Sequence, residues 1–265
     1  MSKMSTRRKL AIATWSAPQE GNIYGKLSVD ATHALAYLDR VRAETGERVT
    51  ITHFVGKVVG AALREAPGLN GYLRFGGYHQ HSTVDVAFLV ALEEGSDLGK
   101  VKVERVDEKR LEDLAREFGA AAAKLRAGKD KQFKKSNDLA RALPTWIIRP
   151  LLALIGWLTG SLGVSLPAAG LEAFPFGACV ITSVGMLGLD EGFVPPTPFA
   201  RVPLYVLLGA IRDQAVVEDG QVVVRPMLTI TATIDHRFMD GFQGAVLARK
   251  VREIFADPSL LYAAG

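Results

Sequence analysis

The chain has 265 residues, of which 48% are hydrophobic and 23% charged. This composition is typical of a globular protein and excludes a disordered or collagen-like chain. A net charge of +4 and a pI of about 9.2 suit phosphate-bearing ligands but give no reason to expect a nucleic-acid partner. The single cysteine, Cys179, excludes an intramolecular disulfide and a multi-cysteine metal site, so we expect no metal.

The N-terminal half reads as helices around one buried strand. Residues 1–15 carry charge without a long apolar run, so we expect no secretory signal and a cytoplasmic location. Leu35, Leu38 and Val41 recur at helical spacing. In chain order, the predicted elements are a helix at 28–42, a second helix at 52–67, a strand buried on both faces at 84–92, and a charged helix at 111–126.

The C-terminal half is richer in strands. Asp219-Gly220 is a strong turn signal for a two-residue β-hairpin. The predicted elements are strands at 179–184 and 203–211, a hairpin at 215–224, a strand at 227–234 and a helix at 242–255. Because helices and strands interleave without a clear linker, we expect a single α/β domain over 1–265 with a mixed sheet packed against helices.

One apolar segment, residues 142–170, does not fit this scheme. It carries only Arg149 as a charge, and its uncharged part approaches the ~20 residues that cross a bilayer. Pro150 and Pro167 interrupt it, and the flank before it is basic. Three interpretations stay open: packing against protein or lining an apolar pocket, contact with a membrane surface, and a membrane span.

The sequence DHRFMDG, residues 235–241, holds the strongest candidate for chemistry. It places His236 at the end of a strand-like apolar run. A histidine can take a proton from a thiol or hydroxyl and return it later, and a strand end would hold it in position. Asp240 would pair with an arginine or fix the loop, and Gly241 would allow a sharp turn. The alternative is an ordinary hydrogen-bonded histidine.

Together with its surroundings, this motif resembles the catalytic domain of the dihydrolipoamide acyltransferases of 2-oxo acid dehydrogenase complexes. That family is marked by Asp-His-Arg, two residues, then Asp-Gly. Residues 53–73, 181–190 and 207–231 are similar to its early helix, its hydroxyl-bearing strand and the approach to its histidine. The resemblance implies a two-layer α/β sandwich like that of chloramphenicol acetyltransferase, with 142–170 as an apolar insertion.

The resemblance also implies an activity and a site. A histidine removes the proton of a coenzyme A or dihydrolipoamide thiol, the thiol attacks an acyl thioester, and a hydroxyl side chain stabilises the oxyanion between two subunits of a trimer. This gives His236 the role of general base. Aligned on Gly185, Thr182 takes the hydroxyl role and Ser183 is the fallback, since neighbouring strand residues face opposite ways.

The same resemblance sets the expected partners. We expect coenzyme A or acyl-coenzyme A as substrate, no covalent lipoyl group in this chain, and a homotrimer or a larger cage. Residues 257–265 are similar to the apolar C-terminal tail of the cage-forming cores, and the apolar insertion suggests a long acyl chain or acceptor. A rival interpretation is a catalytically inactive scaffold or cage protein, and a third is a membrane-peripheral module anchored by 142–170.

Two weaker patterns are set aside. His79 and His81 share strand spacing and face, but two ligands without a third are weak evidence for a metal, and a surface hairpin explains them better. The lysines between 129 and 135 would suit coenzyme A phosphates, but no glycine-rich phosphate loop accompanies them.

Overall fold

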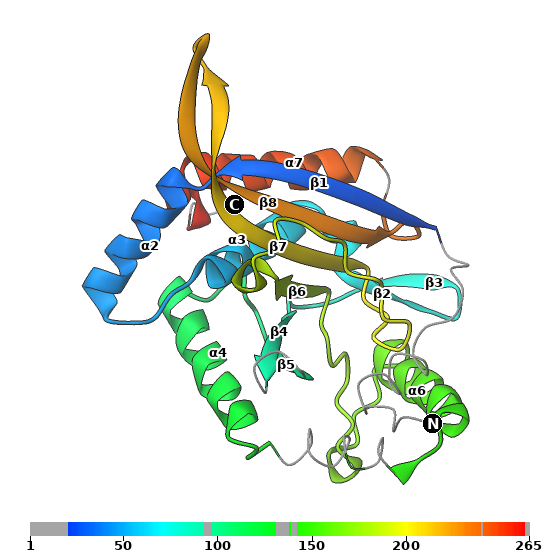
Figure 1. The fold of residues 1–265 in the computed structure, drawn as a ribbon. Helices are drawn as coiled ribbons and strands as arrows, with labels where there is room; N and C mark the ends of the chain where they lie inside the picture. The colour runs from blue at the N-terminus through cyan, green and yellow to red at the C-terminus, as the bar shows by residue number, and fades with distance from the viewer. Residues whose placement is uncertain (1–20, 93–96, 131–137, 139–141, 240, 263–265) are drawn as a thin grey trace, which may run out of the picture.

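The computed structural model describes residues 21–92, 97–130, 138, 142–239 and 241–262. Its centre is a six-stranded mixed sheet in the order β1-β8-β7-β6-β4-β5 (Figure 1). The two pairs that β6 makes, with β4 and β7, are parallel, and the other pairs are antiparallel. The strands are β1 (Asn22–Asp30), β4 (Val86–Leu92), β5 (Asp97–Val103), β6 (Cys179–Ser183), β7 (Leu204–Glu218) and β8 (Gln221–Asp235).

A separate two-stranded hairpin and five α-helices complete the described regular structure, together with short 3₁₀ turns. The hairpin is β2 (Gly71–Arg74) with β3 (Gly77–Gln80). The helices are α2 (Thr32–Thr45), α3 (Ile51–Glu65), α4 (Leu111–Arg126), α6 (Thr145–Gly160) and α7 (Gly241–Ala256). The 3₁₀ turns are η1 (Pro67–Leu69), η3 (Pro167–Ala169), η4 (Gly185–Leu187) and η5 (Pro258–Leu261).

The central helix of the helical layer, α3, begins where the sequence supplies a cap. The Thr50 hydroxyl accepts the backbone N–H of His53, and the Nδ1 of His53 accepts the backbone N–H of Thr50. This reciprocal pair satisfies two donors that the first turn would otherwise leave unpaired. The helix then buries Phe54 and Val58 completely, and it packs against both α7 and the sheet.

Side chains alternate between the two faces of the sheet. Cys179 and Ile181 of β6 point to the main core under the helices, while Val180 points to a smaller cluster on the other face. That cluster includes Tyr205 and residues of the connection that precedes β7, such as Val202. The sheet therefore has helices on one face and irregular chain on the other.

The structure corrects the first predicted helix. Residues 28–30 belong to strand β1, which pairs along its whole length with β8, and the helix runs over Thr32–Thr45. The predicted helix at 111–126 has the observed bounds, and that at 52–67 corresponds to α3. Residues 22–27 show no strand pattern in the sequence because all six are exposed or partly exposed on an edge strand.

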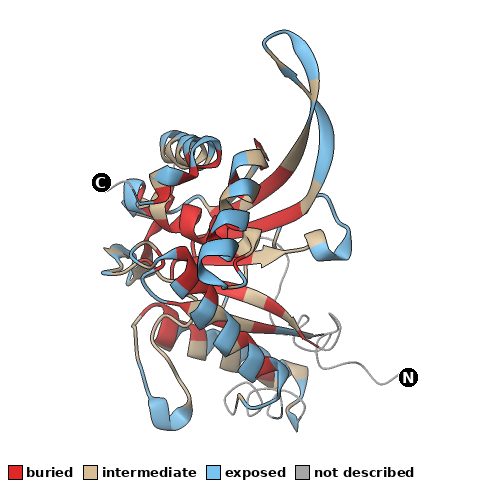
Figure 2. Ribbon diagram, turned by 90° about the vertical axis from the view of Figure 1, so that its left-hand side faces the viewer, coloured by how far each residue is buried: buried red, intermediate tan, exposed pale blue. Residues whose placement is uncertain are grey.

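The C-terminal strands are longer than expected. The predicted strand at 203–211, hairpin at 215–224 and strand at 227–234 form one continuous antiparallel pair, β7 and β8. Asp219 and Gly220 both have positive φ, 48° and 78°, as the predicted two-residue turn requires. The distal half of this hairpin leaves the sheet and is largely exposed (Figure 2).

The apolar segment 142–170 contains a helix that the sequence pattern did not reveal, α6. Two glycines fix its position, because a Cβ on Gly156 would lie 2.3 Å from the carbonyl oxygen of Phe199, and one on Gly160 would lie 3.1 Å from the Cβ of Arg201. The helix therefore rests directly on residues 199–201. No helix within the described parts of the chain has the length and apolar character needed to cross a bilayer.

Candidate functional site

His236 lies in a turn directly after β8 and its side chain is exposed. Its backbone N–H donates to the carbonyl oxygen of Gly21 at 3.2 Å. Neighbouring residues hold the turn on both sides: the backbone N–H of Asp235 donates to Pro203, and Phe238 and Met239 are buried. The imidazole is therefore presented to solvent from a backbone that is fixed before and after it.

The two neighbours of His236 form an ion pair across it. Arg237 donates from Nε and Nη2 to the carboxylate of Asp235 at 2.5–3.0 Å, and its backbone N–H also donates to Oδ1 at 2.9 Å. The Asp235 side chain is only 13% exposed. Two parallel charge-assisted bonds fix the orientation of such a pair. Asp235 and Arg237 thus position the turn, a role that the sequence motif alone did not assign.

Phe238 ties the turn to the β2–β3 hairpin. Its ring lies 6.2 Å from the ring of Tyr78, at an interplanar angle of 73°. The Tyr78 hydroxyl donates in turn to the carbonyl oxygen of Pro67 at 2.6 Å. Aromatic pairs in this edge-to-face geometry stabilise the packing beyond the area they bury. A surface hairpin was expected around His79, but its contact with the His236 turn could not be seen in the sequence.

Thr182 and Ser183 end strand β6, and both side chains are partly exposed. By alternation, Thr182 shares its face with Val180, and Ser183 shares the helical face with Ile181. The backbone of Gly185, which follows, lies close to that of Gly209, since a Cβ on Gly185 would lie 2.6 Å from the carbonyl oxygen of Gly209. The two hydroxyls therefore cannot both serve one site.

Within one chain, Thr182 and His236 are far apart. Thr182 pairs with Leu207 of β7, and Leu207 pairs with Thr231 of β8. His236 comes five residues after Thr231, so it lies roughly 17 Å further along the strand direction at about 3.4 Å per residue. The same geometry separates Ser183 from the histidine. Neither hydroxyl can act with His236 of its own chain on one carbonyl group.

The remaining predicted residues of the motif have separate outcomes. Asp240 lies outside the described residues. Gly241 begins α7, and a Cβ at this position would meet no atom of the same chain within 4 Å. Within one protomer, a side chain at Gly241 would therefore meet no clash.

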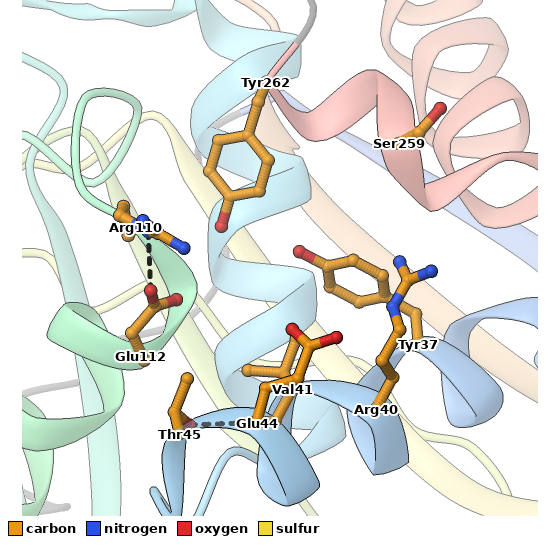
Figure 3. A pocket seen from close by; sticks show the side chains of 9 residues that line it. All are labelled: Tyr37, Arg40, Val41, Glu44, Thr45, Arg110, Glu112, Ser259 and Tyr262. Atoms are coloured by element: carbon orange, nitrogen blue, oxygen red, sulfur yellow. Dashed lines mark hydrogen bonds and ion pairs between the residues drawn. The ribbon is translucent and has the colours of Figure 1, made fainter.

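A cavity of about 330 Å³ lies elsewhere, between α2, the start of α4 and η5 (Figure 3). It sits at the end of β1 opposite the His236 turn. Charged residues in its walls form ion pairs, such as Arg110 with Glu112 at 2.5 Å. Burial and the neighbouring Tyr262 hydroxyl raise the pKa of Tyr37. Because its arginines are accompanied by carboxylates, the cavity offers no net positive charge for phosphates. Within the described residues, no three metal-ligating side chains gather.

The family model and the curated relatives indicate the same family. The family model "2-oxoacid dehydrogenases acyltransferase (catalytic domain)" matches residues 3–137 and 171–263 and leaves 138–170 unmatched. A probable dihydrolipoyllysine-residue succinyltransferase component of the 2-oxoglutarate dehydrogenase complex from Schizosaccharomyces pombe is 24% identical over 84% of this chain and 41% of its own length. This chain thus spans about two fifths of that relative.

Solved structures share the fold. Dihydrolipoamide acetyltransferase from Azotobacter vinelandii superposes with a TM-score of 0.67 at 20% identity, covering 97% of this chain and 87% of the other. A probable dihydrolipoamide acetyltransferase from Listeria monocytogenes gives 0.66 at 22% identity, covering 89% and 85%. The predicted fold class, an α/β fold with a mixed sheet packed against helices, is confirmed and is shared with these acyltransferase structures. The chain belongs to the family of 2-oxoacid dehydrogenase acyltransferase catalytic domains.

Proposed function

We propose that this protein moves an acyl group between coenzyme A and a thiol acceptor, with His236 as general base. The observation that carries this proposal is the presentation of His236, exposed on a turn held by Asp235, Arg237 and Phe238. The A. vinelandii structure was solved to investigate a serine, a histidine and an asparagine in the catalytic mechanism of that enzyme. There the asparagine follows the histidine by four residues, as Asp240 follows His236 here.

The first step, removal of a thiol proton, requires only a modest driving force. His236 takes the proton of the thiol, whose ordinary pKa of ~8.5 is close to neutral pH. The thiolate then attacks the thioester carbon and forms a tetrahedral oxyanion, to which a hydroxyl donates a hydrogen bond. Collapse breaks the bond to the departing thiolate, which takes the proton back from the imidazolium. Every atom and proton is accounted for without a redox partner.

The hydroxyl comes from a second copy in this proposal. A second copy is needed because the separation within one chain excludes both Thr182 and Ser183 from acting with their own His236. We assign the hydroxyl role to Thr182, with Ser183 as the fallback. Met186, Leu187 and Leu189 follow directly after β6 and are 77%, 63% and 52% exposed. Such a run of exposed apolar side chains suits an interface between copies.

The assembly proposed is a homotrimer, as the family resemblance implies. A larger cage is compatible with it, because the cubic core of a pyruvate dehydrogenase multienzyme complex superposes on this chain with a TM-score of 0.67 at 20% identity. The long-chain acyl preference suggested by the apolar insertion is part of the same proposal. The acceptor proposed is a dihydrolipoyl thiol.

The test measures coenzyme A released from acetyl-, octanoyl- and palmitoyl-coenzyme A with dihydrolipoamide as acceptor. We expect His236→Ala to abolish release, and Thr182→Val to lower the rate by about 10²–10³-fold, the usual loss of one oxyanion donor. Ser183→Ala, next to it on the other face of β6, is the matched control and should stay within a few fold of wild type.

Other results would change the assignment. A large loss in Ser183→Ala but not in Thr182→Val would move the hydroxyl role to Ser183. Equal background release from the wild-type protein and His236→Ala would contradict the proposed activity and favour the inactive scaffold. A preference for acetyl-coenzyme A would contradict the long-chain part of the proposal.

A further inference from the structure

Helix α6 is apolar on the side that faces solvent. Its exposed residues recur at positions 146, 149, 150, 153, 154 and 157, the spacing of one helical face. This α6 stripe consists of Trp146, Arg149, Pro150, Ala153, Leu154 and Trp157. Trp146 is 76% exposed and Leu154 is 53% exposed. On a helix at the surface of a water-soluble protein, this face would be charged or polar.

The helix cannot turn the stripe inward. Gly156, on the buried flank of the helix, and Gly160, at its end, pack closely against residues 199–201. Thr159 on the same side is buried and its carbonyl oxygen accepts the backbone N–H of Phe174. The exposure of the stripe is therefore a consequence of how α6 is attached.

A second element extends the stripe. Phe75 lies at the tip of the β2–β3 hairpin, has a positive φ of 50° and is 84% exposed. Its ring lies 6.5 Å from the ring of Trp157. An aromatic side chain held outward at a tight turn, beside a helix with two tryptophans, is an arrangement suited to entering a lipid surface.

Three arginines lie in or beside the stripe. Arg149 lies within it, Arg74 precedes Phe75, and Arg201 contacts the end of α6 by donating from Nη1 to the Ser161 hydroxyl at 3.0 Å. Residues 139–171 contain no Asp or Glu. An arginine in the middle of an apolar protein interface would lose its hydration without an acidic partner from this segment. At the surface of an anionic bilayer, the same arginine meets lipid phosphate.

We propose that the α6 stripe and Phe75 dock this protein on the surface of an anionic phospholipid bilayer. The helix lies in the plane of the interface, with its two tryptophans about 17 Å apart at 1.5 Å per residue. The family model leaves 138–170 unmatched, so this surface is an addition to the part that the family shares. The inference does not rest on acyl transfer, and it holds for an active or an inactive site.

Tryptophan fluorescence and vesicle co-sedimentation test the inference on the full chain. Two of the three tryptophans lie in the stripe, so their emission reports on it. Vesicles of phosphatidylcholine with phosphatidylglycerol should shift the emission to the blue and sediment the protein. Vesicles of phosphatidylcholine alone should bind much more weakly. Trp146→Glu should weaken binding at least about tenfold, and Arg149→Gln about fivefold at low salt.

Val222→Glu is the matched control. Val222 is 73% exposed on the β7–β8 hairpin, so the same charge replaces an equally exposed apolar side chain on another element. It should leave vesicle binding within twofold. Equal losses in Trp146→Glu and Val222→Glu, or no binding by the wild-type protein, would overturn the inference. A change in assembly mass of Trp146→Glu without vesicles would overturn it in favour of a second copy covering the stripe.

Discussion

His236 owes its exposure to the residues on either side of it. Asp235 and Arg237 pair across it, and Phe238 is buried, so the turn is held with the histidine at the surface. The sequence motif singles out His236 as the candidate for the chemistry. It could not predict the contacts that hold the residue, because the partners Gly21, Pro203 and Tyr78 are distant in sequence.

His53 makes the stability of the fold depend on pH. It is 5% exposed, and burial lowers its pKa from 6.5 to about 4. Its Nδ1 accepts a hydrogen bond from Thr50, which the protonated ring could not do. Because the unfolded chain binds the proton at higher pH than the folded one, the stabilisation is complete above pH 6.5 and is lost as the pH falls toward 4.

We therefore expect the free energy of unfolding to fall by up to about 3 kcal/mol per such histidine over that range. Urea unfolding at several pH values measures it. His53→Gln keeps a side-chain acceptor for the Thr50 N–H and has no titrating ring, so its curve should be flatter. His81, whose pKa burial also lowers to about 4, should keep part of the slope. An unchanged slope in His53→Gln would contradict this account.

At the scale of elements, α3 shows how closely the helical layer fits the sheet. A Cβ on Gly56 would lie 2.4 Å from Cζ of Phe88, which is fully buried in β4. We expect Gly56→Ala to lower the free energy of unfolding by about 1–2 kcal/mol, because overpacking outweighs the gain in helix propensity. Denaturant unfolding measures the change.

Gly119 provides the matched control. It lies in the interior of α4, is exposed, and a Cβ there would meet nothing within 4 Å. Gly119→Ala should therefore stabilise the protein by about 0.5–1 kcal/mol through helix propensity alone. Equal stabilisation by both substitutions would show that Phe88 moves aside without lowering the free energy of unfolding, and it would contradict the tight fit.

The elements differ in how well the sequence predicts them. The helix at 111–126 was predicted with its observed bounds because Leu111, Leu114 and Leu125 repeat with helical spacing between charged residues. Helix α6 was not, since both of its faces are apolar and no periodicity marks it. Strand β1 was also missed, because it needs its partner β8 to be recognised as a strand.

At the scale of the whole molecule, the fold class was predictable and the geometry of the site was not. The motifs indicate a family and hence a fold, which the sheet order and the comparisons confirm. The distance between Thr182 and His236 depends on the register of three strands, and sequence spacing does not contain it. If Thr182 and His236 act in one site, as we propose, that register requires them to come from two chains.

The most direct test of this account is complementation between two inactive variants, His236→Ala and Thr182→Val, expressed together. If each site takes its histidine from one copy and its hydroxyl from the next, random mixing gives about one quarter of interfaces with both wild-type residues. We predict that the mixture recovers about a quarter of wild-type coenzyme A release, while each variant alone stays near background. A mixture no more active than the average of the two variants would contradict a site shared between copies.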